Sequence, residues 1–194
     1  MITNFPYEMA SNFTPWVTGP LFDSCELKEI KKYTDNLPLE KGTLLNGKSV
    51  DEKIRKSDVV FFSRNQENFW IFDKINSIID SVNSSFYNMD LFGYHDIQYT
   101  KYNSLGGKYV SHLDINTGVN DNYLTRKLSL TVLLNDTFEG GNFFIDLGEY
   151  AKHEIKLTSG NYIIFPSFLL HGVLDITAGE RESLVVWTLG PKFK

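Results

Sequence analysis

Two stretches in the amino-terminal half of the chain repeat apolar residues at the spacing of a helix. In the stretch 65–84 the repeat has three- and four-residue steps, at Ile71, Ile75, Ile78 and Val82. Such a stripe is typical of a helix that buries one face, so we expect this helix to pack on a sheet. The stretch 23–37 begins with Asp23 and places Glu26 three residues later, a combination that predicts a capped helix start.

From Asp96 onward the pattern changes to short runs of Val, Ile, Leu, Tyr, Phe and Thr, separated by Gly, Asn and Asp. Runs of this kind are typical of strands joined by turns. We predict strands at 96–102, 109–114, 127–134, 142–146, 153–158, 161–165, 170–176 and 182–189. The dipeptide Ser159-Gly160 predicts a tight hairpin turn. About eight short strands favour a barrel or a sandwich.

The predicted strand 127–134 has two different faces. Apolar and hydroxyl-bearing residues alternate along it, as Leu128, Ser129, Leu130, Thr131 and Val132. Because successive side chains of a strand point to opposite faces, one face of this strand should be apolar and the other partly polar. A polar face inside a barrel or sandwich indicates a cavity for a small molecule.

Length and composition fit one domain spanning residues 1–194. Of the 194 residues, 42% are hydrophobic and 14% aromatic, which is enough to fill one sizeable core. The sequence has no repeat, low-complexity tract or Pro/Ser-rich linker at which to divide it. The expected fold class is α+β, mainly β, with a helical support region over 1–90 and a β core over 91–194.

Charge and targeting signals narrow the class of partner. The net charge is −5 without a dense basic tract, so binding to nucleic acid is not expected. No run approaches the roughly 20 apolar residues that span a bilayer, and no export signal opens the chain. We therefore expect a soluble, cytoplasmic protein that makes no membrane contact. Cys25 is the single cysteine, so any metal should be held by histidines and carboxylates.

His112 and Asp114 are the first candidate metal ligands, because residues two apart on a strand share a face. Alone the pair is weak evidence and fits an ordinary surface pair. His171 lies within the apolar segment FPSFLLHGVLDI, where a lone histidine is usually a hydrogen-bonded core residue. Together, two histidines and a carboxylate form a set that binds Fe(II) and leaves positions open. His95 and His153 lack such spacing.

Arg181 favours this metal site over core histidines. An inward arginine is costly unless it meets an anion, and its planar guanidinium matches a carboxylate through two hydrogen bonds. If His171 and Arg181 share one face of a single hairpin, the strands must be joined by a three-residue loop, 178–180, with Gly179 left-handed. That pairing predicts Trp187 across from His171.

Five segments between residues 90 and 191 match those of a known family in order and spacing: QYTKYNSLGGKYVSHLD, RKLSLTVLLND, EGGNFFID, IKLTSGNYIIFPSFLLHGV and TAGERESLVVWTLGP. They resemble the prolyl 4-hydroxylase-like (PKHD-type) branch of the Fe(II)/2-oxoglutarate-dependent dioxygenases. The resemblance implies a double-stranded β-helix core (jelly roll, cupin-like) of about eight strands, with N-terminal supporting helices.

By that resemblance, the iron ligands are His112, Asp114 and His171. Arg181 would bind the 5-carboxylate of 2-oxoglutarate, and Tyr102 would add a phenol hydrogen bond to the same co-substrate. Tyr102 also shares strand parity with Gln98, which places both on one face, although an aromatic strand residue is often ordinary core. Thr131 and Ser183 are further candidates for co-substrate contacts, and both are equally consistent with a structural role in their strands.

The reaction implied by the resemblance is hydroxylation of an unactivated carbon, in a prolyl residue or a proline-like substrate. It would consume 2-oxoglutarate and dioxygen, release succinate and CO2, and use ascorbate as reductant. A peptide or small-molecule substrate would bind in the barrel mouth, where the loops 103–108 and 116–126 are candidate lids. The sequence leaves the substrate and the oligomeric state open.

Three alternatives remain at this point. A nucleic-acid demethylase of the same superfamily would show a second arginine six residues after Arg181, where this chain has Trp187. A zinc hydrolase could use the same two histidines and aspartate, but it would have no need for Arg181. A non-enzymatic β-sandwich that binds a metabolite would use the histidines only to stabilise its fold.

Overall fold

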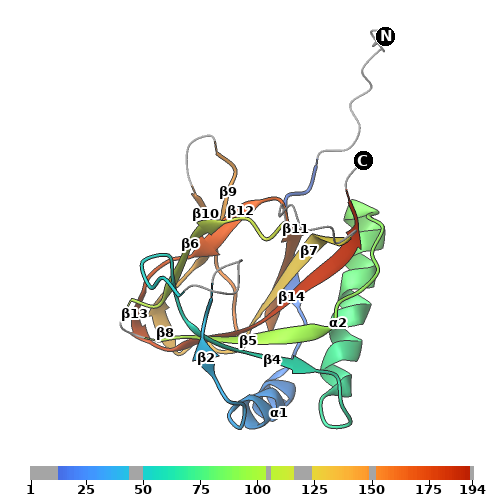
Figure 1. Cartoon of the computed structure of the whole chain (residues 1–194). Coiled ribbons are helices and arrows are strands. Elements are labelled where there is room, and N and C mark those ends of the chain that lie inside the picture. The colour runs from blue at the N-terminus through green and yellow to red at the C-terminus, as the bar shows by residue number, and fades with distance from the viewer. Residues whose placement is uncertain (1–12, 44–49, 104–105, 116–123, 149–151, 193–194) are drawn as a thin grey trace, which may run out of the picture.

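A computed structural model describes residues 13–43, 50–103, 106–115, 124–148 and 152–192 (Figure 1). Its largest element is a seven-stranded sheet in the order β1 (Val17–Pro20), β11 (Asn161–Pro166), β7 (Leu124–Leu133), β14 (Arg181–Pro191), β5 (Asp96–Tyr102), β4 (Asp58–Ser63) and β2 (Glu40–Lys41). Every neighbouring pair in this sheet is antiparallel.

A second antiparallel sheet has five strands in the order β10 (Lys152–Ile155), β9 (Phe143–Asp146), β12 (Leu170–Val173), β6 (Lys108–His112) and β3 (Arg55–Lys56). A two-stranded ribbon pairs β13 (Ile176–Gly179) with β8 (Phe138–Gly140). Side chains of both large sheets meet in one buried cluster, which includes Tyr102, Phe143, Ile163, Phe165 and Val173. The sheets therefore face each other, as in the double-stranded β-helix that the sequence predicted.

Both predicted helices are present. In α1 (Ser24–Thr34), the Asp23 side chain accepts hydrogen bonds from the backbone N–H groups of Cys25 and Glu26, and the Glu26 side chain accepts from the backbone of Asp23. The predicted capping box is therefore confirmed. The second helix, α2 (Phe69–Val82), ends in a π-helical turn, η1 (Asn83–Tyr87).

The two faces of β7 have different neighbours. The buried stripe of α2 packs in one cluster with the apolar positions of β7, which are Leu128, Leu130 and Val132. Figure 1 shows this helix running along the outer side of the larger sheet. Ser129 and Thr131 point the other way, toward the smaller sheet, and are also buried. The alternation seen in the sequence therefore separates the helix-packed core from a polar interior.

The strand predictions fail mainly where the chain passes between sheets. The predicted strand 170–176 is two strands, β12 and β13, which belong to different sheets. Ser159-Gly160 does form a turn, with a 3.0 Å hydrogen bond from Asn161 N to the carbonyl of Thr158. It is not the predicted hairpin, because β10 pairs with β9 whereas β11 pairs with β1 and β7. A local turn signal does not specify which sheet the next strand joins.

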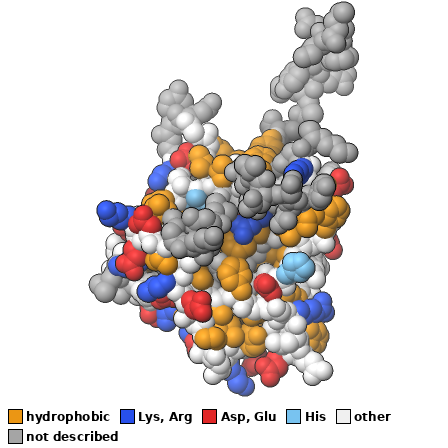
Figure 2. All heavy atoms as spheres, in the orientation of Figure 1, with side chains coloured by type: hydrophobic (Ala, Val, Ile, Leu, Met, Phe, Trp, Pro, Cys, Tyr) orange, Lys and Arg blue, Asp and Glu red, His pale blue; other side chains and the backbone are white. Residues whose placement is uncertain are grey.

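The amino-terminal region is also less purely helical than predicted. It contributes β1, β2 and β4 to the larger sheet and β3 to the smaller one. On the face shown in Figure 2, acidic and basic side chains of the described residues are interspersed, without a broad basic area. No helix in the described part of the chain is both long and apolar enough to cross a membrane.

Candidate metal and co-substrate site

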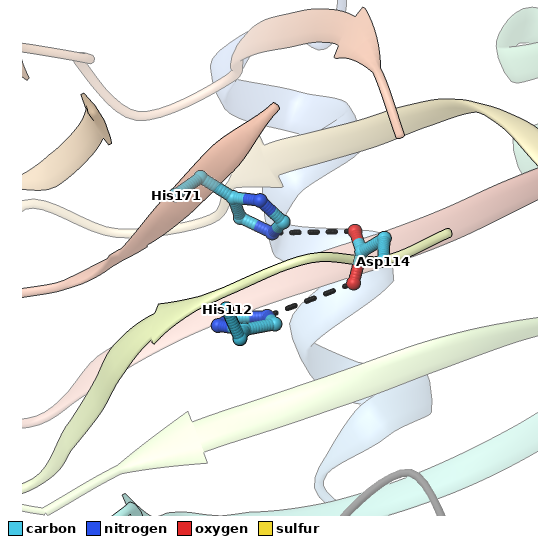
Figure 3. A group of neighbouring side chains, drawn as sticks. All are labelled: His112, Asp114 and His171. Atoms are coloured by element: carbon cyan, nitrogen blue, oxygen red, sulfur yellow. Dashed lines mark ion pairs between the residues drawn. The ribbon is translucent and has the colours of Figure 1, made fainter. Parts of the chain in front are cut away.

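Three potential metal ligands converge between the sheets (Figure 3). His112 ends β6, and His171 lies directly opposite it on β12. Asp114 follows two residues after His112. The ligand atoms of the three side chains all lie within 4.8 Å of one another. The His112 Nε2 is 3.6 Å and the His171 Nε2 is 3.2 Å from the nearer oxygen of Asp114. The structure thus brings together the residues that the sequence singled out.

The ring orientation of both histidines suits metal binding. The Nδ1 atoms of His112 and His171 each lie 2.9 Å from a backbone carbonyl oxygen, of Val110 and Leu169 respectively. A carbonyl only accepts, so each Nδ1 carries a hydrogen, and each Nε2, which faces Asp114, is left to bind a metal. Burial lowers the pKa of His112, which favours the neutral, ligating form of its imidazole.

Asp114 is held from several sides. Ser129 donates a 2.7 Å hydrogen bond to its carboxylate and lies 2.9 Å from the hydroxyl of Ser167. Burial alone would raise the pKa of Asp114, but its contacts with His171 and His112 outweigh burial and hold the pKa well below the usual value. An ionised carboxylate beside two imidazoles, which bind a metal in their neutral form, is a set of donors for a divalent cation.

The predicted strand 109–114 ends before Asp114, so this residue lies in the loop that follows β6. Strand β6 ends at His112, and the backbone N–H groups of Asp114 and Ile115 both donate to the carbonyl of Ser167. The loop after the strand therefore turns toward the segment between β11 and β12. The side chains of His112 and Asp114 converge through this turn and not through strand parity.

The ligands open onto a cavity of about 410 Å³, a volume that includes its mouth. The predicted co-substrate residues all contribute to its lining, namely Tyr102, Thr131, Arg181 and Ser183. Thr131 and Ser183 belong to neighbouring strands of the larger sheet, whereas the two histidines belong to the smaller one. The cavity is therefore the space between the sheets, with the metal ligands at one side.

Arg181 is only 2% exposed. It lies opposite Tyr102 in the β14–β5 pairing, and its guanidinium carbon is 5.6 Å from the centre of the Tyr102 ring. Its Nη1 donates a 3.2 Å hydrogen bond to the hydroxyl of Ser183. No carboxylate among the described residues forms an ion pair with it, and burial lowers its pKa. A buried cation without an anion marks a place for one to bind.

The predicted hairpin between His171 and Arg181 is wrong, although both residues line the cavity. Strand β13 pairs with β8, and β14 pairs with β5 and β7, so no β12–β14 hairpin forms. Trp187 consequently lies opposite Ser129 and not opposite His171. Gly179 does have the predicted left-handed backbone, with φ of 73°. His171 and Arg181 share the cavity because their two sheets face each other.

Tyr109 is a cavity residue that the sequence reasoning missed. Its ring stacks on His112 with centroids 3.5 Å apart, and the guanidinium carbon of Arg55 lies 4.8 Å from the Tyr109 ring centre. Tyr109 is three residues before His112, so strand parity would place the two on opposite faces. The pairing register shifts between them, since His171 faces His112 while Val173 faces Tyr109. This bulge turns both side chains inward.

The sequence gives no local signal for two further arginines near the cavity. Arg55 is 8% exposed and lines the cavity from β3. The guanidinium carbon of Arg126, on β7, lies 4.1 Å from the ring centre of Trp187, which also lines the cavity. His95 and His153 lie outside the group formed by His112, Asp114 and His171.

Comparison with known proteins agrees with this geometry. A family model described as the 2OG-Fe(II) oxygenase superfamily matches residues 97–189. A PKHD-type hydroxylase of Psychrobacter sp. (strain PRwf-1) is 40% identical over 88 residues, which cover 43% of this chain and 34% of that protein. One from Stenotrophomonas maltophilia is 37% identical over 86 residues, which cover 42% of this chain and 38% of that protein. The chain thus matches little more than a third of the length of these curated relatives.

Solved structures show the same fold at low identity. A Trichoplax adhaerens prolyl hydroxylase, in complex with a hypoxia inducible factor peptide fragment, has a TM-score of 0.73 at 19% identity and covers 91% of this chain and 84% of its own. A Pseudomonas putida prolyl-4-hydroxylase has a TM-score of 0.69 at 19% identity, covering 92% and 94%. The carbocyclase SnoK has a TM-score of 0.68 at 11% identity, covering 91% and 79%. The jelly-roll fold is therefore shared by proteins with different reactions.

The family match covers the strands that carry every candidate ligand and co-substrate residue, from Tyr102 to Ser183. Those residues form one cavity with two histidines, an aspartate and a buried arginine. On the sequence matches, the fold and this arrangement, residues 97–189 resemble a domain of the 2OG-Fe(II) oxygenase superfamily.

Proposed function

We propose that the chain is an Fe(II)- and 2-oxoglutarate-dependent hydroxylase that acts on a carbon of a prolyl residue or a proline-like unit. One observation carries the proposal: a single cavity joins the His112–Asp114–His171 set to the buried guanidinium of Arg181. A dicarboxylic 2-oxo acid would meet the metal with its oxo-acid end and the arginine with its other carboxylate.

The donor set fits Fe(II). The Nδ1 atoms of His112 and His171 face backbone carbonyls, and their Nε2 atoms face the Asp114 carboxylate. Two imidazoles and one carboxylate bind a divalent iron and leave positions for the co-substrate and dioxygen. When bound, the iron, 2-oxoglutarate and dioxygen supply the oxidising chemistry, with release of succinate and CO2. Ascorbate is the reductant that we expect to sustain turnover.

Polar side chains in the cavity would position the co-substrate. Arg181 would pair with the 5-carboxylate, and Ser183 already accepts a hydrogen bond from Nη1 of Arg181, which fixes the direction of the guanidinium. Tyr102 lies beside Arg181, and its hydroxyl would donate to the same carboxylate. Thr131, from the neighbouring strand, would complete the polar wall. Apolar residues between these groups, such as Phe143 and Val185, would exclude water from the reaction.

The proline-like substrate rests on the relatives and on the cavity. The matching proteins from Psychrobacter and Stenotrophomonas are described as PKHD-type hydroxylases, and two of the similar structures are prolyl hydroxylases. In this chain, two aromatic rings line the cavity. The ring of Tyr109 stacks on the metal ligand His112, and the ring of Trp187 comes from β14. Flat aromatic faces suit the compact apolar ring of proline.

Two other reactions receive less support. A zinc hydrolase could use the same three ligands, but it would leave the buried charge of Arg181 without an anion. A nucleic-acid demethylase would meet Trp187 where a second arginine is expected, on a protein with a net charge of −5. Hydroxylation with 2-oxoglutarate uses both the three metal ligands and the buried charge of Arg181.

Anaerobic titration of the metal-free protein with Fe(II) and 2-oxoglutarate tests the proposal. An optical charge-transfer band should form, because it requires the 2-oxo acid to chelate the iron. In Arg181→Ala the band should need at least about tenfold more 2-oxoglutarate, since a charged hydrogen-bond partner is lost. Arg64→Ala is the matched control, because Arg64 is exposed and ion-paired with Asp73 away from the cavity.

A folded protein that binds Fe(II) but forms no band would contradict the proposal and would favour the hydrolase. The substrate class is tested separately, by incubating the loaded enzyme with proline-containing peptides and with free proline in air. Gain of one oxygen atom by the probe, measured by mass spectrometry, is the expected result. Coupled succinate release should accompany it.

A further inference from the structure

The arginines of the chain are distributed unevenly. There are four, and only Arg64 forms an ion pair with a described carboxylate. Of the other three, Arg55 and Arg181 line the cavity of the candidate active site, and Arg126 covers the ring of Trp187, which also lines it. The proposed function uses Arg181 for the co-substrate and leaves Arg55 and Arg126 without a role.

Arg55 and Arg126 approach the metal ligands from opposite sheets. Arg55 comes from β3 in the smaller sheet, and its guanidinium carbon lies 4.8 Å from the centre of the Tyr109 ring that stacks on His112. Arg126 comes from β7 in the larger sheet and covers the ring of Trp187. Tyr109 lies within the electrostatic reach of both arginines and of Asp114. Arg55 therefore lines the cavity beside Tyr109, and Arg126 lies behind the cavity residue Trp187.

Removing the charged guanidinium groups of Arg55 and Arg126 from water costs free energy. Burial lowers the pKa of Arg126, and Asp114 opposes that effect. Arg55 is 8% exposed, and its Nε donates to Ser57 Oγ and its Nη1 to the carbonyl of Thr43. These neutral acceptors orient the guanidinium but do not balance its charge. A buried and a half-buried cation beside one cavity favour the binding of an anion there.

The net charge of the site with Fe(II) and 2-oxoglutarate bound also favours an anionic ligand. The two charges of Fe(II) balance the two of 2-oxoglutarate, and the Asp114 carboxylate balances one arginine. The two histidines are neutral as ligands. Among the described residues that line the cavity, Asp114 is the only carboxylate. Within the described part of the chain, two arginine charges therefore remain unbalanced when the metal and the co-substrate are both in place.

From this we infer that the substrate carries a carboxylate that Arg55 and Arg126 bind beside the metal site. This inference rests on the proposed function and specifies its substrate class: a proline-like unit with a free carboxylate, or a peptide with an acidic residue next to the hydroxylated one. Arg126 also stacks on Trp187, so the anion would be held beside the aromatic wall that receives the ring.

Binding of matched probe pairs tests the inference. The first pair is N-acetyl-L-proline and N-acetyl-L-prolinamide. The second comprises acetyl-Glu-Pro-Ala-amide and acetyl-Ala-Pro-Glu-amide, each against acetyl-Ala-Pro-Ala-amide. Dissociation constants are measured by calorimetry on the anaerobic complex with Fe(II) and 2-oxoglutarate. At least one acidic probe should bind about tenfold or more tightly than its neutral partner, as expected for charge-assisted hydrogen bonds.

Variants of Arg55 and Arg126 distinguish the effect of their charge on probe binding from the effect of their packing. Arg55→Gln and Arg126→Gln should each reduce the acid preference by about tenfold, whereas Arg126→Lys should retain part of it because the positive charge remains. Arg64→Gln should leave the preference unchanged. Equal binding of acidic and neutral probes would overturn the inference, as would a preference that survives in both glutamine variants.

The charge-transfer band on the same samples distinguishes the two proposals. A normal band combined with no binding of any acidic probe overturns the carboxylate inference and leaves the proposed function intact. A missing band overturns the proposed function, and this inference with it.

Discussion

Ser129 donates a 2.7 Å hydrogen bond to the Asp114 carboxylate and thereby connects the larger sheet to the metal-ligand group. Asp114 itself follows the end of β6, in the smaller sheet. The serine is 1% exposed and lies opposite Trp187 on β14. One hydrogen bond thus fixes a ligand from the opposite side of the cavity. Partners of this kind orient ligands and are expected to affect metal affinity.

Ser129→Ala should therefore weaken Fe(II) binding by about tenfold to a hundredfold while the protein stays folded. The loss is measured by competition with a chelator, and the fold by circular dichroism. Ser63→Ala is the control, since Ser63 makes a similar 2.6 Å hydrogen bond to Asp96 at an exposed position. An unchanged metal affinity in Ser129→Ala would show that the bond does not orient the ligand.

Metal binding should stabilise the native state through all three ligands. A metal that binds only the folded protein adds about 2.7 kcal/mol at a hundredfold excess over its dissociation constant. Mn(II), which dioxygen oxidises less readily than Fe(II), should raise the melting temperature of the wild type. Asp114→Ala should abolish that rise, because two histidines without the carboxylate bind the metal poorly. A full Mn(II)-induced rise in this variant would contradict the assignment of Asp114.

Tyr102→Phe tests the second contact with the co-substrate. Loss of one hydrogen bond to a carboxylate should raise the dissociation constant of 2-oxoglutarate by about tenfold or more, while Fe(II) affinity stays the same. Tyr94→Phe is the matched control, because the buried Tyr94 hydroxyl has no hydrogen-bond partner among the described residues. Equal 2-oxoglutarate affinity in wild type and Tyr102→Phe would remove Tyr102 from the co-substrate site.

Gly172→Ala should disturb the metal site through the backbone. A Cβ at Gly172 would lie 2.4 Å from the carbonyl oxygen of Tyr109 and 2.6 Å from the Phe144 ring. Relief of these contacts must shift β6 or β12, the strands that carry the two histidines, at a cost of about 1–3 kcal/mol. We expect a lower melting temperature together with weaker Fe(II) binding, measured by thermal unfolding and chelator competition.

Gly148→Ala provides the comparison. Gly148 has a positive φ of 83°, but a Cβ there would meet nothing within 4 Å. Its substitution should cost only the backbone strain of about 1–2 kcal/mol and leave metal affinity unchanged. If both variants lost metal affinity equally, general destabilisation and not displacement of the histidines would be the cause.

The local features of the chain were readable from its sequence. The cap at Asp23, the buried stripe of α2 and the two faces of β7 follow from rules that involve only neighbouring residues. The same applies to the choice of His112, Asp114, His171 and Arg181, because their side-chain chemistry limits what a buried cluster of them can bind. The structure brings these four residues to one cavity.

Only the tertiary structure decided how these residues meet. The sequence placed His171 and Arg181 on one hairpin, whereas they lie on facing sheets. It gave no reason to place Tyr109 beside His112, because the bulge that turns it inward arises from pairing with β12. Arg55 and Arg126 likewise reach the cavity through strands far apart in the chain. Strand pairing and sheet assignment depend on contacts between distant residues, which no local pattern specifies.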